Sequence, residues 1–163
     1  MVKIDAKTLK KLSHSCAKNR LGAYLFNLAL RFGIPYSGSI GAQITEIRPG
    51  WAKVRLPDRR KVRNHLNCIH AVALTNLGEL TSGLALNMAL PDNTRGIVTR
   101  LTTEFYKKAR GDLIATCRCQ LPAAIETDTD FTVVAKIYNA QNTPVAQTTV
   151  HWRLSPITER KNS

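Results

Sequence analysis

The sequence predicts an α+β fold, a six-stranded antiparallel sheet wrapped around one long central helix, with an N-terminal helical extension. Three observations lead to this prediction. Residues 69–90 form a long apolar segment with one formal charge, flanked by two alternating apolar and polar segments before it and four after it. The 163 residues suffice for one hydrophobic core. Because the segment 69–90 is apolar on all sides, it needs a surface that covers most of it, and a curled sheet supplies one.

The composition is that of a globular protein, with 44% hydrophobic and 21% charged residues. We expect a helical extension over residues 1–35, one domain over 36–155 and a basic tail over 156–163. The first residues, MVKIDAKTLKKL, lack the apolar stretch of a secretory signal, and no two of the four cysteines form a C-x-x-C pair. A reduced, cytoplasmic protein is the simplest interpretation.

The elements before the central helix follow from residue spacing and turn signals. Leucines at three- and four-residue spacing predict helix over residues 6–32, which Gly33 ends. Alternating apolar residues predict a hairpin over residues 40–56 that turns after Pro49. Residues 58–67 are polar and basic, so we expect a loop there.

The central helix is expected over residues 69–90, and Pro91 stops it. Four strands joined by short turns follow, which we interpret as an antiparallel meander. In the first of these strands, alternation predicts that every second residue from Ile97 to Phe105 shares one face.

Glu79 carries the one formal charge of the central helix. A carboxylate in such a helix is costly unless it is protonated, paired or turned toward a cavity, and desolvation raises its pKa. A carboxylate of raised pKa is a candidate general base or nucleophile. The alternative is a structural glutamate that is paired within the core or faces a dimer partner.

The loop that enters the central helix is the second candidate region. The first N–H groups of a helix have no partner within it and lie at the positive end of the helix dipole, so this end can stabilise an oxyanion or polarise a carbonyl group. If the helix begins near His70, Glu79 lies about 13 Å further along it. A partner chain could therefore bring the carboxylate and the helix start together.

The segment NHLNCIHAVALTNLGEL, residues 64–80, resembles the signature N-x-x-G-x-x-H-G-G, followed by an acid, of hotdog-fold thioesterases of the phenylacetic-acid-degradation type. The Asn, His and acid of the signature fall on Asn64, His70 and Glu79, and its three glycines fall on Asn67, Ala71 and Val72. The order of elements is similar to that of the hotdog fold over residues 36–155, and the wider chain resembles the uncharacterised hotdog family DUF4442.

This resemblance implies hydrolysis of an acyl-coenzyme A or acyl-carrier thioester at a dimer interface. The Ala71 N–H would polarise the thioester carbonyl, while Asn64 and His70 would orient the thioester or a water molecule. Glu79 of the partner chain would activate water or attack the carbonyl. Where some relatives have a Ser or Thr on the strand after the helix, this chain has Val98, with Thr99 beside it.

The net charge of +13 favours an anionic partner. The residues expected to contact the substrate or its phosphates are Arg59, Arg60, Asn67, Val98, Thr99, Lys107 and Lys108. We expect no metal, no cofactor beyond the coenzyme A of the substrate, no membrane span and no nucleic acid partner. The resemblance further implies a homodimer, with a homotetramer of two dimers left open.

Three alternatives also stay open at this stage. A hotdog protein that binds an acyl ligand without catalysis is consistent with the loss of the signature glycines. A hotdog hydratase or dehydratase would pair His65 with Glu79. Nucleophilic catalysis by Cys68 with a nearby histidine is the third, although no third orienting group is evident in the sequence.

Overall fold

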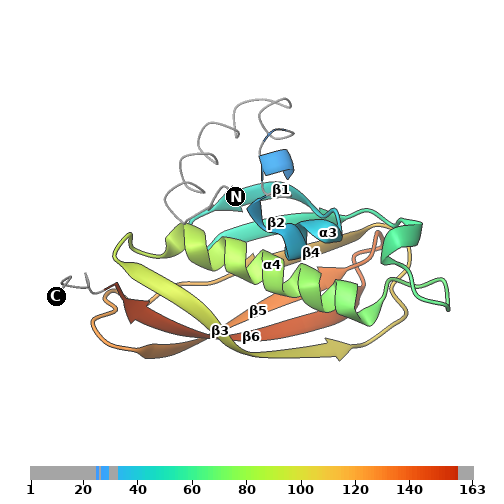
Figure 1. Cartoon of the computed structure of the whole chain (residues 1–163). Coiled ribbons are helices and arrows are strands. Elements are labelled where there is room, and N and C mark those ends of the chain that lie inside the picture. The colour runs from blue at the N-terminus through green and yellow to red at the C-terminus, as the bar shows by residue number, and fades with distance from the viewer. Residues whose placement is uncertain (1–24, 26, 30–32, 158–163) are drawn as a thin grey trace.

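The computed structural model describes residues 25, 27–29 and 33–157. In these residues a six-stranded antiparallel sheet curves around one long helix, α4 (Ala71–Ala89), which packs against all six strands (Figure 1). The predicted α+β architecture is confirmed. Most of the helix predicted over residues 6–32, and all but the first two residues of the expected tail 156–163, lie outside the described residues.

The bounds of the strands are β1 (Gln43–Arg48), β2 (Trp51–Leu56), β3 (Thr94–Phe105), β4 (Leu113–Arg118), β5 (Thr129–Tyr138) and β6 (Pro144–Pro156). A short helix, α3 (Pro35–Ser39), precedes β1, and one 3-10 turn, η1 (Arg60–Val62), lies between β2 and α4. The predicted hairpin is β1 and β2, and it turns at Gly50, whose φ of 72° is a left-handed conformation that glycine adopts readily.

The order of strands in the sheet is β1-β2-β4-β5-β6-β3. The prediction of a four-strand meander is therefore wrong. Strands β4, β5 and β6 do follow one another, but β3 pairs with β6, and β4 pairs with β2. Alternation along a strand determines which side chains are buried, and it carries no information about which strand lies alongside.

A β-bulge in β3 changes which of its residues face the helix. The register with β6 shifts between Val98 and Arg100, so that both Val98 and Leu101 lie opposite buried residues of β6. Ile97 points the other way and is 55% exposed. The prediction that every second residue from Ile97 to Phe105 shares a face is wrong, because the extra residue of the bulge reverses the alternation.

The central helix is buried along most of its length, as its apolar sequence predicts. It starts after His70 and ends before Leu90, next to Pro91. Gly78 permits a close approach of β6, since a Cβ atom there would lie 2.2 Å from the Thr148 hydroxyl oxygen. None of the helices in the described ranges has the length and apolarity needed to cross a membrane.

The two edges of the sheet differ. At the β1 edge, the Asn27 side-chain amide donates to the Ile44 carbonyl (3.2 Å) and accepts from the Ile44 N–H (2.6 Å), as a neighbouring strand would. On the outer side of β3, no strand lies alongside in the part of the chain that the structure describes. Leu101 and Phe105 on β3 are 43% and 50% exposed. An open edge of this length is available for pairing with another strand.

Candidate active site

Glu79 faces a cleft of about 350 Å³ between α4 and β3, which we call the Glu79 cleft. Its lining is mostly apolar and comprises Tyr36, Val72, Thr75, Asn76, Glu79, Val98 and Leu101. Burial raises the pKa of the Glu79 carboxyl, and a hydrogen bond from the Ser37 side chain opposes this rise. The sequence left this carboxylate three possibilities: to be protonated, paired or turned toward a cavity. In the structure it faces a cavity, and its pKa is raised.

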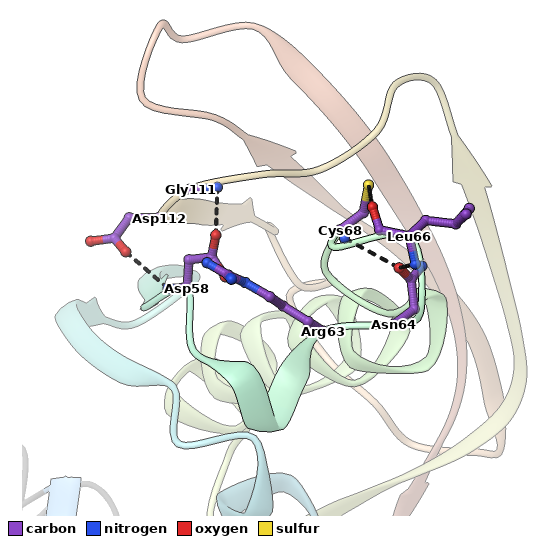
Figure 2. Close-up of polar contacts among 7 residues, drawn as sticks. All are labelled: Asp58, Arg63, Asn64, Leu66, Cys68, Gly111 and Asp112. Carbon is purple, nitrogen blue, oxygen red and sulfur yellow. Dashed lines mark hydrogen bonds and ion pairs between the residues drawn. The ribbon is translucent and has the colours of Figure 1, made fainter.

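The loop before α4 is shaped by Asn64 (Figure 2). Its side-chain oxygen accepts from the N–H groups of Leu66 (2.9 Å) and Cys68 (3.2 Å), and its own N–H donates to the Cys68 carbonyl (2.8 Å). Asn64 therefore closes a tight turn that leads into the helix. A side chain with both an acceptor and a short reach suits this position.

Asn67 lies in the same turn with a φ of 54°, which is left-handed. This is the position where the resembling signature has its first glycine. Asparagine tolerates the left-handed region better than other residues with a Cβ atom, so the turn can keep its conformation without the glycine.

We expect Asn67→Ala to lower the free energy of unfolding by about 1 kcal/mol, because alanine is strained at a left-handed φ. Asn67→Gly is the matched variant and should be at least as stable as the natural chain. Urea unfolding of the three proteins measures both effects. Equal stability of the Ala and Gly variants would contradict the assigned strain.

His70 caps the start of α4. Its Nδ1 atom accepts from the Val72 N–H (3.1 Å), while its backbone carbonyl accepts from the Leu74 N–H (3.1 Å). The Ala71 N–H, the first of the helix, has no hydrogen-bond acceptor among the described residues. The structure therefore brings Asn64, His70 and Ala71 together at the helix start, as the sequence predicts.

A second cleft, also of about 350 Å³, opens at this end of the helix, and we call it the helix-start cleft. The residues that line it are Asn64, Leu66, Cys68, Ile69, Ala71, Leu74, Phe105, Tyr106, Lys107, Lys108 and Ala109. Its walls are largely apolar, and two lysines from the segment after β3 supply positive charge. The unpaired N–H of Ala71 and these lysines thus belong to one cleft.

Asp58 anchors the loop to the segment before β4 (Figure 2). Its carboxylate, on a side chain only 12% exposed, accepts from Arg63 Nε (2.6 Å) and from the Gly111 N–H (2.9 Å). The Asp58 N–H donates to the Asp112 carboxylate (2.9 Å), which is also paired with Arg55. The hydrogen bond from Arg63 holds the pKa of Asp58 below its usual value. Sequence reasoning missed this anchor, although an acid among basic loop residues is a usable signal.

The predicted substrate contacts are distributed over both clefts and beyond them. Val98 lines the Glu79 cleft, and Lys107 and Lys108 line the helix-start cleft. The Arg59 guanidinium donates instead to the carbonyls of Ile40 (2.9 Å) and Gly41 (2.7 Å).

Three further predicted contacts line neither cleft. Arg60 is exposed on η1, and Asn67 is exposed in the turn before the helix. The Thr99 hydroxyl donates to the His151 carbonyl (3.2 Å), next to the β-bulge.

None of the three cysteines that the structure describes, Cys68, Cys117 and Cys119, is exposed. Cys68 is buried, and its sulfur contacts the Leu66 carbonyl (3.4 Å). Burial raises the pKa of the Cys117 thiol to about 12 and also raises the pKa of Cys119. Within the described ranges, no cluster of three His, Cys, Asp or Glu side chains is arranged to hold a metal ion.

The two clefts lie one after the other along β3, and both include residues from the first turns of α4. Glu79 is about 12 Å beyond Ala71 along the helix, at 1.5 Å per residue. The Glu79 cleft lies next to Val98 and Leu101, and the helix-start cleft lies next to Phe105 and Tyr106. Within one chain, the Glu79 carboxylate is therefore distant from the free N–H groups at the start of α4.

The chain is similar to known proteins both in sequence and in fold. The family model DUF4442, described as a domain of unknown function, matches residues 22–154. No curated protein matches the sequence. The crystal structure of the genomics target APC5556 is 28% identical, with a TM-score of 0.78 over 91% of this chain and 98% of that chain.

Two other crystal structures share the fold at lower identity. The Pseudomonas aeruginosa protein PA5026, named a probable thioesterase, is 21% identical with a TM-score of 0.70, over 82% of this chain and 95% of that one. The Haemophilus influenzae thioesterase HI1161 is 13% identical with a TM-score of 0.65, over 95% of both chains. The architecture of the present chain is the hotdog fold that these proteins share.

Proposed function

We propose that this chain, which belongs to the DUF4442 family and has the hotdog fold, hydrolyses an acyl-coenzyme A or acyl-carrier thioester. The observation that carries the proposal is Glu79, a largely buried carboxylate of raised pKa on the wall of an apolar cleft. An apolar cleft with a few polar groups suits an acyl chain next to a reacting carbonyl. The thioesterase names of two proteins with the same fold agree with this reaction class.

We further propose that the working unit is a homodimer joined along β3. A two-fold axis beside this open edge pairs the two β3 strands antiparallel. In this arrangement, the half of β3 that lies next to Glu79 in one protomer pairs with the half that lies next to the start of α4 in the other protomer. Each dimer would hold two composite sites, each with Glu79 from one protomer and the Ala71 N–H from its partner. Pairing of two such dimers into a tetramer stays a prediction.

In this composite site, each group has one chemical task. The Ala71 N–H stabilises the oxygen of the thioester carbonyl as negative charge develops on it. Glu79 takes a proton from water, and the water oxygen bonds to the carbonyl carbon. The carbon–sulfur bond then breaks, and protonated Glu79 returns the proton to the departing thiolate. Asn64 and His70 hold the loop and the helix start in place through the hydrogen bonds described above.

Lys107 and Lys108 are the proposed contacts for phosphate groups of coenzyme A, because they line the cleft that contains the Ala71 N–H. Arg60 and Asn67 are exposed and lie close in sequence to residues that line this cleft, and they stay secondary candidates. Arg59 and Thr99 are secondary candidates as well. We also propose a reduced, cytoplasmic setting, which agrees with the free state of Cys68, Cys117 and Cys119.

Disruption of the β3 edge should separate the protomers. We expect Leu101→Lys to weaken dimerisation by about a hundredfold, because it brings two like charges into an apolar interface. Sedimentation velocity across a concentration series measures the dissociation, and activity should fall in parallel. Leu25→Lys, at a position 52% exposed and two residues before Asn27 at the opposite, β1 edge of the sheet, is the matched control. A Leu101→Lys variant that stays dimeric would exclude this interface.

The proposed function is tested by release of free thiol from acyl-coenzyme A substrates with short, long and aromatic acyl groups. Turnover above the uncatalysed rate supports the proposal. Val72, which is 55% exposed at a signature glycine position, favours a second candidate, an acyl-binding protein without catalysis. Tight binding of a non-hydrolysable acyl-coenzyme A ether with no turnover on any thioester would replace the first candidate by the second.

A further inference from the structure

The Glu79 cleft is followed by two glycines on the side toward the end of α4. Gly83 lies one turn after Glu79 on the same face of the helix, and Gly96 lies two residues before Val98 on the same face of β3. Neither glycine extends a side chain into the layer between the helix and the sheet. The space beyond this end of the cleft is therefore open to a side chain from another element.

That side chain is Trp152 of β6. A Cβ atom on Gly83 would lie 3.5 Å from Cη2 of the indole, and a Cβ atom on Gly96 would lie 3.3 Å from its Cε3. Trp152 is opposite Val98 in the register of β3 with β6 and is 5% exposed. One indole ring thus occupies the gap that the two glycines leave between α4 and β3.

The ring also lies close to the Glu79 carboxylate. The Cβ position on Gly83 that is 3.5 Å from the ring is 3.8 Å from Glu79 Oε1. The carboxylate oxygen and the edge of the indole therefore border one small gap over the Gly83 backbone. An acyl group that reacts beside Glu79 and extends toward the end of α4 would meet the indole after a few carbon atoms.

We propose that Trp152 determines the acyl specificity of this chain by closing the Glu79 cleft behind the carboxylate, so that short acyl groups fit and long ones are excluded. The inference rests on the proposed function, which seats the acyl group in the Glu79 cleft. It narrows the substrate from acyl thioesters in general to thioesters with a short or compact acyl group.

The chemistry of the indole indicates that its size is the property used at this position. The N–H of Trp152 is buried and has no acceptor among the residues that the structure describes. A buried donor without a partner destabilises the folded state. Phenylalanine would pack in the same layer without this penalty, but its ring is smaller and would leave the cleft partly open.

The first test measures binding without catalysis. The chain has two tryptophans, so Trp51→Phe leaves Trp152 as the single indole. Trp51 lines neither cleft, and its indole N–H donates to the Glu46 carboxylate (3.1 Å). The probes are non-hydrolysable acyl-coenzyme A ethers of increasing acyl length that carry bromine, a contact quencher of indole fluorescence, on the last carbon.

We expect quenching of Trp152 to begin at the length at which the bromine reaches the ring. Affinity should then fall by about tenfold or more when two further carbon atoms are added, because they no longer fit. Absence of quenching at every length, for ethers that bind, would overturn the inference.

The second test compares the acyl-length dependence of kcat/KM in three variants. Trp152→Leu should extend the preferred acyl group by about two to four carbon atoms and raise kcat/KM for these longer groups by about tenfold. Gly83→Ala adds a methyl group beside the ring and the carboxylate, so it should shorten the preferred group. Leu113→Ala, at a fully buried position of β4 that lines neither cleft, is the control for lost packing.

The outcomes separate the specificity from the reaction. An unchanged length preference in a folded Trp152→Leu protein would contradict the proposed role of the ring, as would an equal shift in Leu113→Ala. If Trp152→Leu does not fold, Gly83→Ala and the quenching series decide. If the natural chain hydrolyses no thioester but the ethers quench Trp152 in the expected length-dependent way, the proposed hydrolysis fails while closure of the cleft by Trp152 stands.

Discussion

Glu79→Gln is expected to lower kcat/KM for thioester hydrolysis by about a thousandfold, within the range found for loss of a general base. The amide has nearly the shape of the carboxylate, but it cannot take a proton from water. It should therefore leave the apolar cleft and the binding of the acyl group largely intact. Thiol release under single-turnover conditions measures the chemical step, and the fall should appear in kcat more than in KM.

The stability of this variant separates lost chemistry from lost structure. Burial raises the pKa of Glu79 in the folded chain above its unfolded value, so the folded state binds its proton more tightly. Ionisation of Glu79 therefore lowers the free energy of unfolding as pH rises from the unfolded to the folded pKa of this carboxyl. Above the folded pKa the loss stays constant. Glu79→Gln should be at least as stable as the natural chain at neutral pH. A folded variant that keeps full activity would remove Glu79 from the mechanism.

Ala71→Pro is expected to lower kcat by about a hundredfold or more, the effect of removing one donor to a developing oxyanion. Proline removes the N–H of Ala71 and little else. Ala71 is the first residue of α4, where proline is well tolerated, and His70 has a ψ of 140°, which suits a residue before proline. Thermal unfolding should show no loss of stability. An active, folded Ala71→Pro protein would show that another group stabilises the oxyanion.

Mixing the two inactive variants tests which protomer supplies which group. In a dimer with composite sites, Glu79→Gln and Ala71→Pro chains that exchange at random should recover about a quarter of the natural activity. Half of the dimers are then mixed, and each mixed dimer has one intact site of two. If Glu79 serves the helix start of its own chain, no mixed site is intact and no activity returns.

Much of the fold could be predicted because its signals are local. A long apolar segment with Glu79 as its one formal charge indicates a buried central helix, and the turn after Pro49 indicates a hairpin. The place of β3 beside β6 could not be predicted, since it depends on how the chain after Phe105 returns to the middle of the sheet. The bulge at Val98 was equally hidden, because Ile97 is apolar although exposed, so the apolar residues of the sequence still alternate across the extra residue.

The candidate site was predictable as far as one contiguous segment reaches. Asn64, His70 and Glu79 lie within that segment, so their residue types and spacing could be read together. Ser37 and Asp58 act across the fold, on Glu79 and on the Gly111 N–H. Their contributions come from burial and from hydrogen bonds between segments distant in sequence, for which a serine or an aspartate alone gives no indication.

The side-chain amide of Asn27, which is hydrogen-bonded to the backbone of Ile44, also affects how this protein can assemble. A sheet with two open edges can add copies at both ends and grow into a fibre. Here the backbone N–H and carbonyl of Ile44 on β1 are already paired with Asn27, so joining two copies along β3, as proposed, leaves a twelve-stranded sheet with a partly blocked strand at each end. In such a dimer, a further strand could pair along β1 only after displacing Asn27 from Ile44, which disfavours growth beyond two copies.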